Sequence, residues 1–397
     1  MDIVERFKDL ISFDTMSNEN SSSYPSTSSQ IEFGKKLLNI LKEEGINNSY
    51  QDEFGLIYAR IDNGSKETIG LIAHMDTSPS LIGGIKNPRI IESYDGKDIV
   101  LDEKYTMKIN DFPFLKDLIG EKLMVTDGKH LLGGDDKAGI AIILEFAKYY
   151  VNHKDEFNFN LAIGFTPDEE IGAGALHFDP KKMNANVAFT LDGESIYEAN
   201  YENFNAAHAK VTILGVGVHP GMAKNIMVNA AQLGSEFVMD LPSNMVPEKT
   251  ELREGFIHLT DFKGDCEKCE LSFILRDHDK TLLEEKKAIL GKEKEKFEKK
   301  YPKAEIKLEI ADDYRNMFDY FKNDMKAINL INKAYLKKGV KISYTPIRGG
   351  TDGATITYLG LPCPNLGVGD FSPHGRFELV SITQMNIMVE ILKELFK

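Results

Sequence analysis

Leu132-Gly133-Gly134-Asp135-Asp136-Lys137-Ala138-Gly139 sets two adjacent carboxylates between flexible glycines and an apolar helical run at 139–146. A carboxylate has two oxygens, so Asp135 could bridge two divalent cations that lie a few ångströms apart, as in two-metal hydrolases. Taken alone, the same residues also fit an aspartate that caps the start of a helix. The choice between these interpretations depends on the rest of the chain.

Three short apolar segments end in residues that can bind a metal. Residues 68–73 lead into His74 and Asp76, residues 160–165 lead into Glu169 and Glu170, and residues 186–191 lead into Asp192. Continuous apolar segments predict strands that are buried on both faces of a sheet. Ligand sites of open α/β sheets gather at the carboxyl ends of the strands. The sequence therefore predicts an α/β fold, a catalytic α/β/α sandwich with a di-metal site at one edge of its sheet.

The pattern changes from about residue 207. Strand-like segments at 211–214, 256–262, 271–275 and 304–310 alternate with helix-like segments at 225–239 and 282–300. The order βαββαβ is that of a ferredoxin-like domain. We therefore expect a catalytic domain in two parts, residues 1–206 and 315–397, and an inserted lid or dimerisation-type domain, residues 207–314. Apolar residues at helical spacing predict further helices at 1–12, 31–43, 323–338 and 382–396.

Composition argues against several classes of protein. The formal net charge of −14 argues against nucleic acid or an anionic membrane as the main partner. No secretory signal is visible at the start, and no apolar run approaches the length of a membrane span. The cysteines, Cys266, Cys269 and Cys363, cannot all pair, which favours a reducing cytoplasm. Cys266 and Cys269 have no second pair to complete a zinc site, so we expect no structural metal there.

Five residues are candidate metal ligands: His74, Asp135, Glu170, Asp192 and His374. Imidazole and carboxylate suit zinc, manganese or cobalt better than copper(I) or iron–sulfur chemistry. Two divalent cations carry four positive charges against three carboxylates, and a bridging hydroxide would neutralise the charge that remains. We therefore expect two Zn²⁺ per subunit, with Co²⁺ or Mn²⁺ as substitutes.

Two further residues have predicted roles beside these ligands. His74 and Asp76 are two positions apart at a strand end, so Asp76 can hold the second ring nitrogen of His74. Glu169 adjoins the ligand Glu170 and could take a proton from the bridging water and return it to a leaving amine. The sequence thus predicts a hydrolase with Glu169 as its general base.

Several motifs together resemble the M20 metallopeptidase family, and most closely its tripeptide aminopeptidases. They are 74–77, 126–128, 131–139, 168–172, 192–193, 218–224, 254–256, 276–277, 348–353 and 361–365. The resemblance implies one metal on His74 and Asp192, another on Glu170 and His374, and Asp135 bridging both. It also implies a cis peptide bond after Asp135. The segment 368–373, before His374, departs from the family pattern.

The resemblance also implies residues that contact the substrate. His219, in the inserted domain, would stabilise the oxyanion of the tetrahedral intermediate. Asn229, Arg276 and Arg348 are candidates for binding the substrate backbone or its carboxylate, which an arginine can grip in bidentate fashion. The expected substrates are short peptides, mainly tripeptides with a free N-terminus, and a homodimer is left open.

Other functions remain open at this point. A dipeptidase or an N-acyl amino acid deacylase would use the same chemistry. A blocked amino terminus distinguishes an aminopeptidase, which needs a free terminus, from a deacylase, which needs an acylated one. A non-catalytic peptide- or metal-binding protein would be expected to lack Glu169 or a ligand, and this sequence contains all of them. Side-chain preference, the metal in the cell and the oligomeric state are left undetermined.

Overall fold

The structure is a computed structural model that describes residues 1–397. The chain divides into two compact units. Unit 1 contains Met1–Tyr201, Asp319–Thr345 and Thr351–Lys397, and unit 2 contains Glu202–Phe318 and Pro346–Gly350. Unit 2 thus includes a short segment, 346–350, that is far along the chain from its other residues.

A large mixed sheet forms the centre of unit 1. Its strands are β1 (Ser49–Gln51), β2 (Ile57–Ile61), β3 (Thr68–His74), β8 (Asn160–Thr166), β9 (Val187–Gly193), β10 (Glu198–Asn200), β15 (Ser343–Tyr344) and β16 (Asn365–Gly367). They follow the order β1-β2-β8-β3-β9-β16-β10-β15. β3 pairs in parallel with β8 and with β9, and every residue of β3 and β8 is buried. The structure therefore confirms the three predicted strands as neighbours in a buried sheet.

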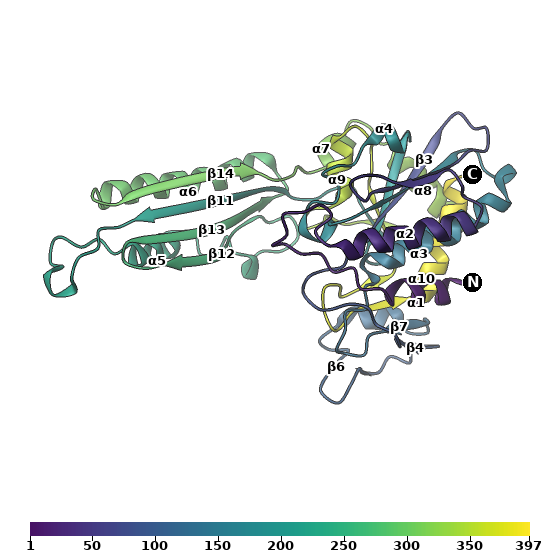
Figure 1. Cartoon of the computed structure of the whole chain (residues 1–397), viewed down its shortest axis with the longest axis horizontal. Helices are drawn as coiled ribbons and strands as arrows, with labels where there is room; N and C mark the ends of the chain where they lie inside the picture. The colour runs from purple at the N-terminus through teal and green to yellow at the C-terminus, as the bar shows by residue number, and fades with distance from the viewer. The chain divides into compact units, whose positions relative to one another are not determined.

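Helices cover both faces of this sheet (Figure 1). They are α1 (Ile3–Ile11), α2 (Ser28–Glu43), α3 (Gly134–Asn152), α4 (Pro180–Met183), α8 (Lys326–Lys338), α9 (Asp352–Tyr358) and α10 (Ile382–Leu395). α3 packs on β3 and β9 and also contacts α1 and α10. Elsewhere on the sheet, Met183 of α4 and Ile356 of α9 join a core with Ile72 of β3 and Ala188 of β9. This is the predicted α/β/α sandwich, and the predicted helices correspond to α1, α2, α8 and α10.

Unit 1 also contains two small sheets that sequence analysis missed. β4 (Arg89–Ile91), β7 (Leu123–Val125), β17 (Asp370–Phe371) and β18 (Leu379–Ser381) form one sheet, and β5 (Ile99–Val100) pairs with β6 (Thr106–Met107). These strands are too short for a periodic pattern to be visible. The segment between β17 and β18 contains His374, so the pairing of β18 with β7 fixes the region around a predicted ligand.

Unit 2 has the predicted βαββαβ order. Its elements are β11 (Asn205–Leu214), α5 (Ala230–Asp240), β12 (Phe256–Gly264), β13 (Lys268–Asp277), α6 (Lys280–Lys300) and β14 (Glu305–Asp312). The antiparallel strands follow the order β12-β13-β11-β14, as in ferredoxin-like domains. Phe237 of α5 and Phe297 of α6 pack together with ring centroids 5.5 Å apart, in the core formed with the strands. α7 (Phe318–Phe321) crosses a boundary between the units.

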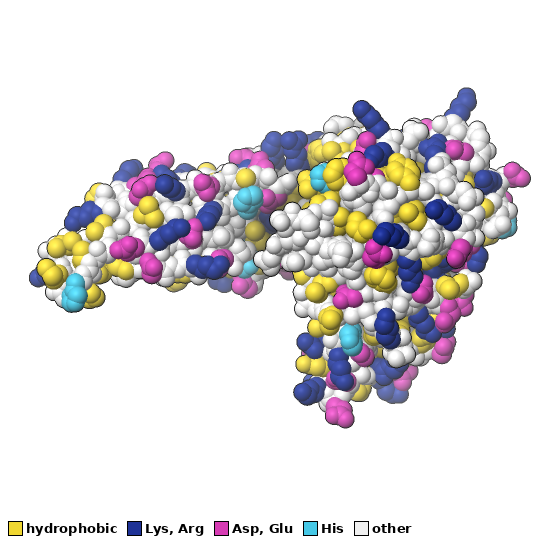
Figure 2. Space-filling view, viewed as in Figure 1, with side chains coloured by type: hydrophobic (Ala, Val, Ile, Leu, Met, Phe, Trp, Pro, Cys, Tyr) yellow, Lys and Arg dark blue, Asp and Glu magenta, His cyan; other side chains and the backbone are white.

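Charges of both signs are mixed on the surface. On the face shown in Figure 2, Lys and Arg side chains are interspersed with Asp and Glu, without one extended basic area. A nucleic-acid-binding face would be expected to gather its basic residues. None of the helices combines the length and the apolar character that crossing a membrane requires.

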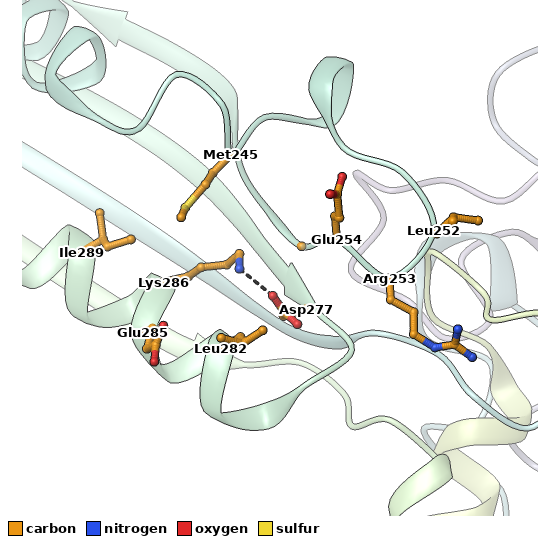
Figure 3. A pocket seen from close by; sticks show the side chains of 10 residues that line it. Met245, Leu252, Arg253, Glu254, Asp277, Leu282, Glu285, Lys286 and Ile289 are labelled. Carbon is orange, nitrogen blue, oxygen red and sulfur yellow. Dashed lines mark hydrogen bonds and ion pairs between the residues drawn. The ribbon is translucent and has the colours of Figure 1, made fainter.

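A buried ion pair joins α6 to β13 in unit 2. Nζ of Lys286 donates to Oδ2 of Asp277 at 2.5 Å, and the two side chains are 7% and 2% exposed (Figure 3). The pair lines a cavity of about 540 Å³ together with apolar side chains such as Met245 and Ile289. Removing one partner would leave the other charge buried without compensation.

Lys286→Met is therefore expected to lower the free energy of unfolding by about 3–5 kcal/mol. Urea titration followed by circular dichroism measures this change. Lys296→Met is the matched control, because Lys296 pairs with Asp240 on the exposed surface of α6 and α5. Equal effects of the two substitutions would show that burial does not govern the contribution of Lys286.

Candidate active site

Two groups of potential metal ligands lie together in unit 1 and share one residue. The first group is His74, Asp135 and Asp192, and the second is Asp135, Glu170 and His374. Nε2 of His74 lies 2.7 Å from Oδ1 of Asp135, whereas Nε2 of His374 lies 3.1 Å from Oδ2 of Asp135. The two oxygens of Asp135 thus face different imidazoles, and its role as a bridging ligand stays a prediction.

The sheet explains why these residues meet. β3 and β8 are paired so that His74 lies opposite Thr166, and β9 lies on the other side of β3. His74 ends β3, Asp192 lies near the end of β9, and Glu170 lies just after β8 in a short 3₁₀ helix, Glu169–Ile171. Nε2 of His74 is 3.5 Å from Asp192, and Nε2 of His374 is 2.8 Å from Glu170. All five predicted ligands therefore converge at one edge of the sheet.

The two interpretations of Asp135-Asp136 apply to different residues. Asp135 and Asp136 lie within α3 but have non-helical backbone angles, so the regular helix begins after them. Asp136, not Asp135, caps this regular part, because its Oδ1 accepts a hydrogen bond from the Gly139 N–H at 3.2 Å. Oδ2 of Asp136 accepts the backbone N–H of His74. The peptide bond between Asp135 and Asp136 is cis, which confirms the expectation from the family resemblance. Gly139 permits close packing, since a Cβ there would lie 2.0 Å from the carbonyl oxygen of Leu191.

Glu378 holds the loop that carries Asp135. Its carboxylate accepts hydrogen bonds from the backbone N–H groups of Gly133, Gly134 and Asp135. It is 1% exposed and lies 243 residues beyond Asp135 in the chain. Sequence analysis missed Glu378, because a single glutamate before β18 carries no local signal.

Asp76 links His74 to the predicted general base. Nδ1 of His74 is 3.1 Å from the carbonyl oxygen of Asp76 and 3.4 Å from its carboxylate. That carboxylate also accepts the backbone N–H groups of Glu169 and Glu170, at 3.0 and 3.2 Å. Asp76 therefore contacts His74 through its backbone and its side chain, and its carboxylate also orients the turn that carries Glu169 and Glu170.

A second buried network holds the same turn from the other side. Asp168 has a left-handed backbone, with φ of 57°. Its carboxylate accepts hydrogen bonds from the N–H and O–H of Ser26 and from the side-chain amide of Gln30. Gln30 Oε1 in turn accepts the Asp168 N–H. Sequence analysis did not connect residues 26–30 with this turn, because nothing local indicates the pairing.

The electrostatics of the cluster favour cations. Burial, followed by the negative charge of Asp192, raises the pKa of Glu169 well above its usual value. Burial, followed by Asp135, raises the pKa of Glu170. Hydrogen bonds with Asp135 and Glu170 raise the pKa of His374, so the carboxylates draw positive charge toward them.

The residues present fit a pair of divalent cations. Oε1 of Glu170 is buried and has no hydrogen-bond partner, so a donor atom is available beside His374. The ligand atoms of each group lie within 4.8 Å of one another. Histidine nitrogen and carboxylate oxygen are the donors that zinc, cobalt and manganese accept.

The predicted substrate-contacting residues all belong to unit 2. His219 precedes a 3₁₀ helix, Pro220–Met222, and its Nδ1 accepts the Gly221 N–H at 3.1 Å. Asn229 caps α5, with Oδ1 accepting the Gln232 N–H. Both side chains therefore have local partners, and their predicted roles with substrate stay predictions.

The two arginines are also engaged within unit 2. Arg276 donates to the carbonyl oxygen of Ala207, forms an ion pair with Asp313 at 3.4 Å and lies over the ring of Tyr314. Arg348 donates to the carbonyl oxygens of Leu252 and Glu254, and to both oxygens of Thr250. These contacts hold the chain segment at 250–254. Substrate binding by either arginine stays a prediction.

Comparisons with known proteins place the fold in the M20 class of peptidases. Residues 201–305 match the M20 peptidase dimerisation domain, and residues 120–247 match the M42 glutamyl aminopeptidase family. A dinuclear metal-binding peptidase of the M20 family from Bacillus subtilis superposes with a TM-score of 0.63 over 99% of this chain and 96% of its own, at 13% identity. The aminopeptidase PepT of Bacillus cereus gives 0.77 over 99% and 97%, at 19% identity.

Sequence relatives define the family more narrowly. Peptidase T of Clostridium botulinum is 44% identical over 98% of this chain and 97% of its own length. Peptidase T of Clostridium perfringens is 44% identical over 99% and 98%. The chain belongs to the peptidase T family of M20 metallopeptidases. The family assignment from sequence motifs is thereby confirmed.

Proposed function

We propose that this protein is a zinc-dependent aminopeptidase that releases the N-terminal residue of tripeptides. The observation that carries the two-metal part of this proposal is the placement of Asp135, whose two oxygens face His74 and His374. His74 and Asp192 would hold one ion, Glu170 and His374 the other, and Asp135 both. The tripeptide specificity rests on membership of the peptidase T family.

The metal pair, when bound, would polarise the scissile carbonyl and lower the pKa of a water molecule so that it can attack. Glu169 takes the proton from that water and returns it to the amine that leaves. Asp76 supports both parts of this chemistry. It orients the candidate metal ligand His74, and it fixes the backbone of the proposed base Glu169. Co²⁺ or Mn²⁺ would serve in place of Zn²⁺ with the same donor set.

Unit 2 would complete the site with residues 207–314 acting as a lid. His219 would donate a hydrogen bond to the oxyanion of the tetrahedral intermediate. Asn229, Arg276 and Arg348 would bind the substrate backbone or its terminal carboxylate. We also propose a cytoplasmic location, in line with the free cysteines, and leave a homodimer through the dimerisation domain open.

A peptide panel with metal analysis tests this proposal. The expected result is rapid cleavage of tripeptides that have a free amino terminus, slow cleavage of dipeptides and tetrapeptides, and two metal ions per chain. The reason is that groups holding both charged ends of the substrate would leave one end unpaired in a peptide of another length, at a cost of about 1–3 kcal/mol or more.

Other results would assign another activity. Preference for N-acylated substrates would identify a deacylase, and preference for dipeptides would identify a dipeptidase. Equal rates on a tripeptide, its C-terminal amide and a tetrapeptide would replace the tripeptidase with a general aminopeptidase.

A further inference from the structure

A large cavity opens beside one side of the metal cluster in unit 1. Its volume is about 800 Å³, and it is lined by Glu170 and His374 together with residues of two loops, 16–27 and 78–80. The other group of ligands, His74 and Asp192, does not line it. The cavity is therefore joined to the Glu170–His374 side of the cluster.

Apart from His374, the charged side chains that line this cavity are carboxylates, which favour a cation over an anion. Its walls contain hydroxyl and amide side chains, among them Ser78, Ser80 and Asn18, and no lysine or arginine. The one carboxylate apart from Glu170 belongs to Glu19. The hydroxyl and amide groups could donate to a terminal carboxylate, but no lysine or arginine is present to pair with its charge, and Glu19 would repel it. The amino end of a peptide, which carries no negative charge of its own, fits this side of the cluster.

The loop that carries Glu19 is fixed, whereas its carboxylate is free to bind. The Asn18 N–H donates to Oγ of Ser26, and Ser26 is itself bound to Asp168. Across the cavity, Oγ of Ser80 donates to the carbonyl oxygen of His374 at 2.7 Å. The structure has no hydrogen bond or ion pair to the Glu19 carboxylate, and Glu19 is exposed.

The residues of the cavity wall also limit which substrate side chains fit the cavity. No aromatic residue lines it, and Met16 and Pro79 provide its apolar surface. An aromatic substrate side chain would therefore find few apolar partners, whereas a long cationic side chain could pack its stem on Met16 and place its charge near acceptors.

We propose that this cavity is the subsite for the side chain of the substrate's N-terminal residue, and that Glu19 makes it select lysine or arginine. The proposal rests on the proposed aminopeptidase function. It adds the specificity of the first residue, which the sequence does not reveal.

The test compares Lys-Ala-Ala with norleucine-Ala-Ala. The two peptides share the α-ammonium group and the unbranched hydrocarbon part of the side chain, and the lysine peptide adds a terminal ammonium group. With the metal-loaded wild-type protein, kcat/KM is expected to be about three- to tenfold higher for the lysine peptide, the effect of one charge-assisted contact in a half-exposed cavity. In Glu19→Gln this ratio is expected to fall to about one.

Glu103→Gln is the matched control, because Glu103 is an exposed glutamate of unit 1 that does not line the cavity. It is expected to keep the wild-type ratio. If Glu19→Gln has the same ratio of kcat/KM values as the wild-type protein, the role of Glu19 is overturned. This holds even if the variant loses activity equally on both peptides. A wild-type ratio of about one would overturn the subsite itself. Failure of the wild-type protein to cleave either peptide would instead contradict the aminopeptidase function.

Discussion

Glu169→Ala is expected to lower kcat by about 10²–10⁴-fold while both metal ions stay bound. The reason is that Glu169 lies beside the ligand Glu170 without belonging to either group of ligand atoms. Its backbone is held by Asp76, so removal of the side chain should leave the turn in place. Steady-state kinetics on a tripeptide, together with metal analysis of the same sample, measure both quantities.

Glu169→Gln separates proton transfer from packing. Glutamine keeps the shape of the side chain but cannot accept the proton, so its kcat is expected to fall as far as that of Glu169→Ala. Activity near the wild-type level in Glu169→Gln, with normal metal content, would show that another group acts as the base.

Asp135→Ala is expected to reduce metal occupancy as well as activity. Asp135 belongs to both ligand groups, and each of its oxygens faces a different histidine. Loss of this residue removes one ligand from each ion and leaves His74 and His374 without their shared carboxylate. Metal content after dialysis against a weak chelator is the direct measurement, and the expected activity is close to background.

Glu170→Ala is the matched comparison for the bridging role. Glu170 belongs only to the group with His374, so this variant is expected to weaken one ion and keep the other on His74, Asp135 and Asp192. Two ions bound to Asp135→Ala with wild-type affinity would contradict the bridge. Circular dichroism of each variant establishes that the fold is retained.

The buried strands and the ligands at their ends could be predicted from local sequence. β3, β8 and β9 are apolar along their length because both faces of the sheet are covered, and that pattern is visible without a structure. Parallel neighbours bring their carboxyl ends together, so His74, Glu170 and Asp192 could be assigned to one site. The long helices and the βαββαβ order of unit 2 were also visible in local sequence, because apolar residues recur there at helical or strand spacing.

The supporting contacts could not be predicted in this way. Glu378 binds the backbone of the Asp135 loop, and Ser26 and Gln30 bind Asp168, but each pair is separated by more than a hundred residues. A single polar residue in a loop has no periodic pattern that names its partner. The partners of Arg276 and Arg348 within unit 2 could be identified only from the tertiary structure.

The sequence by itself determined the long helices, the buried central strands and the βαββαβ order, and it singled out the five candidate ligands and Glu169. The reason is that hydrophobic periodicity and metal-binding residue types are properties of short segments. Only the tertiary structure decided that Asp136 caps the helix while Asp135 faces both histidines. It also placed the Glu19 loop on a cavity beside Glu170. The physical reason is that side-chain direction depends on backbone angles and on packing between distant segments, which no short stretch of sequence encodes.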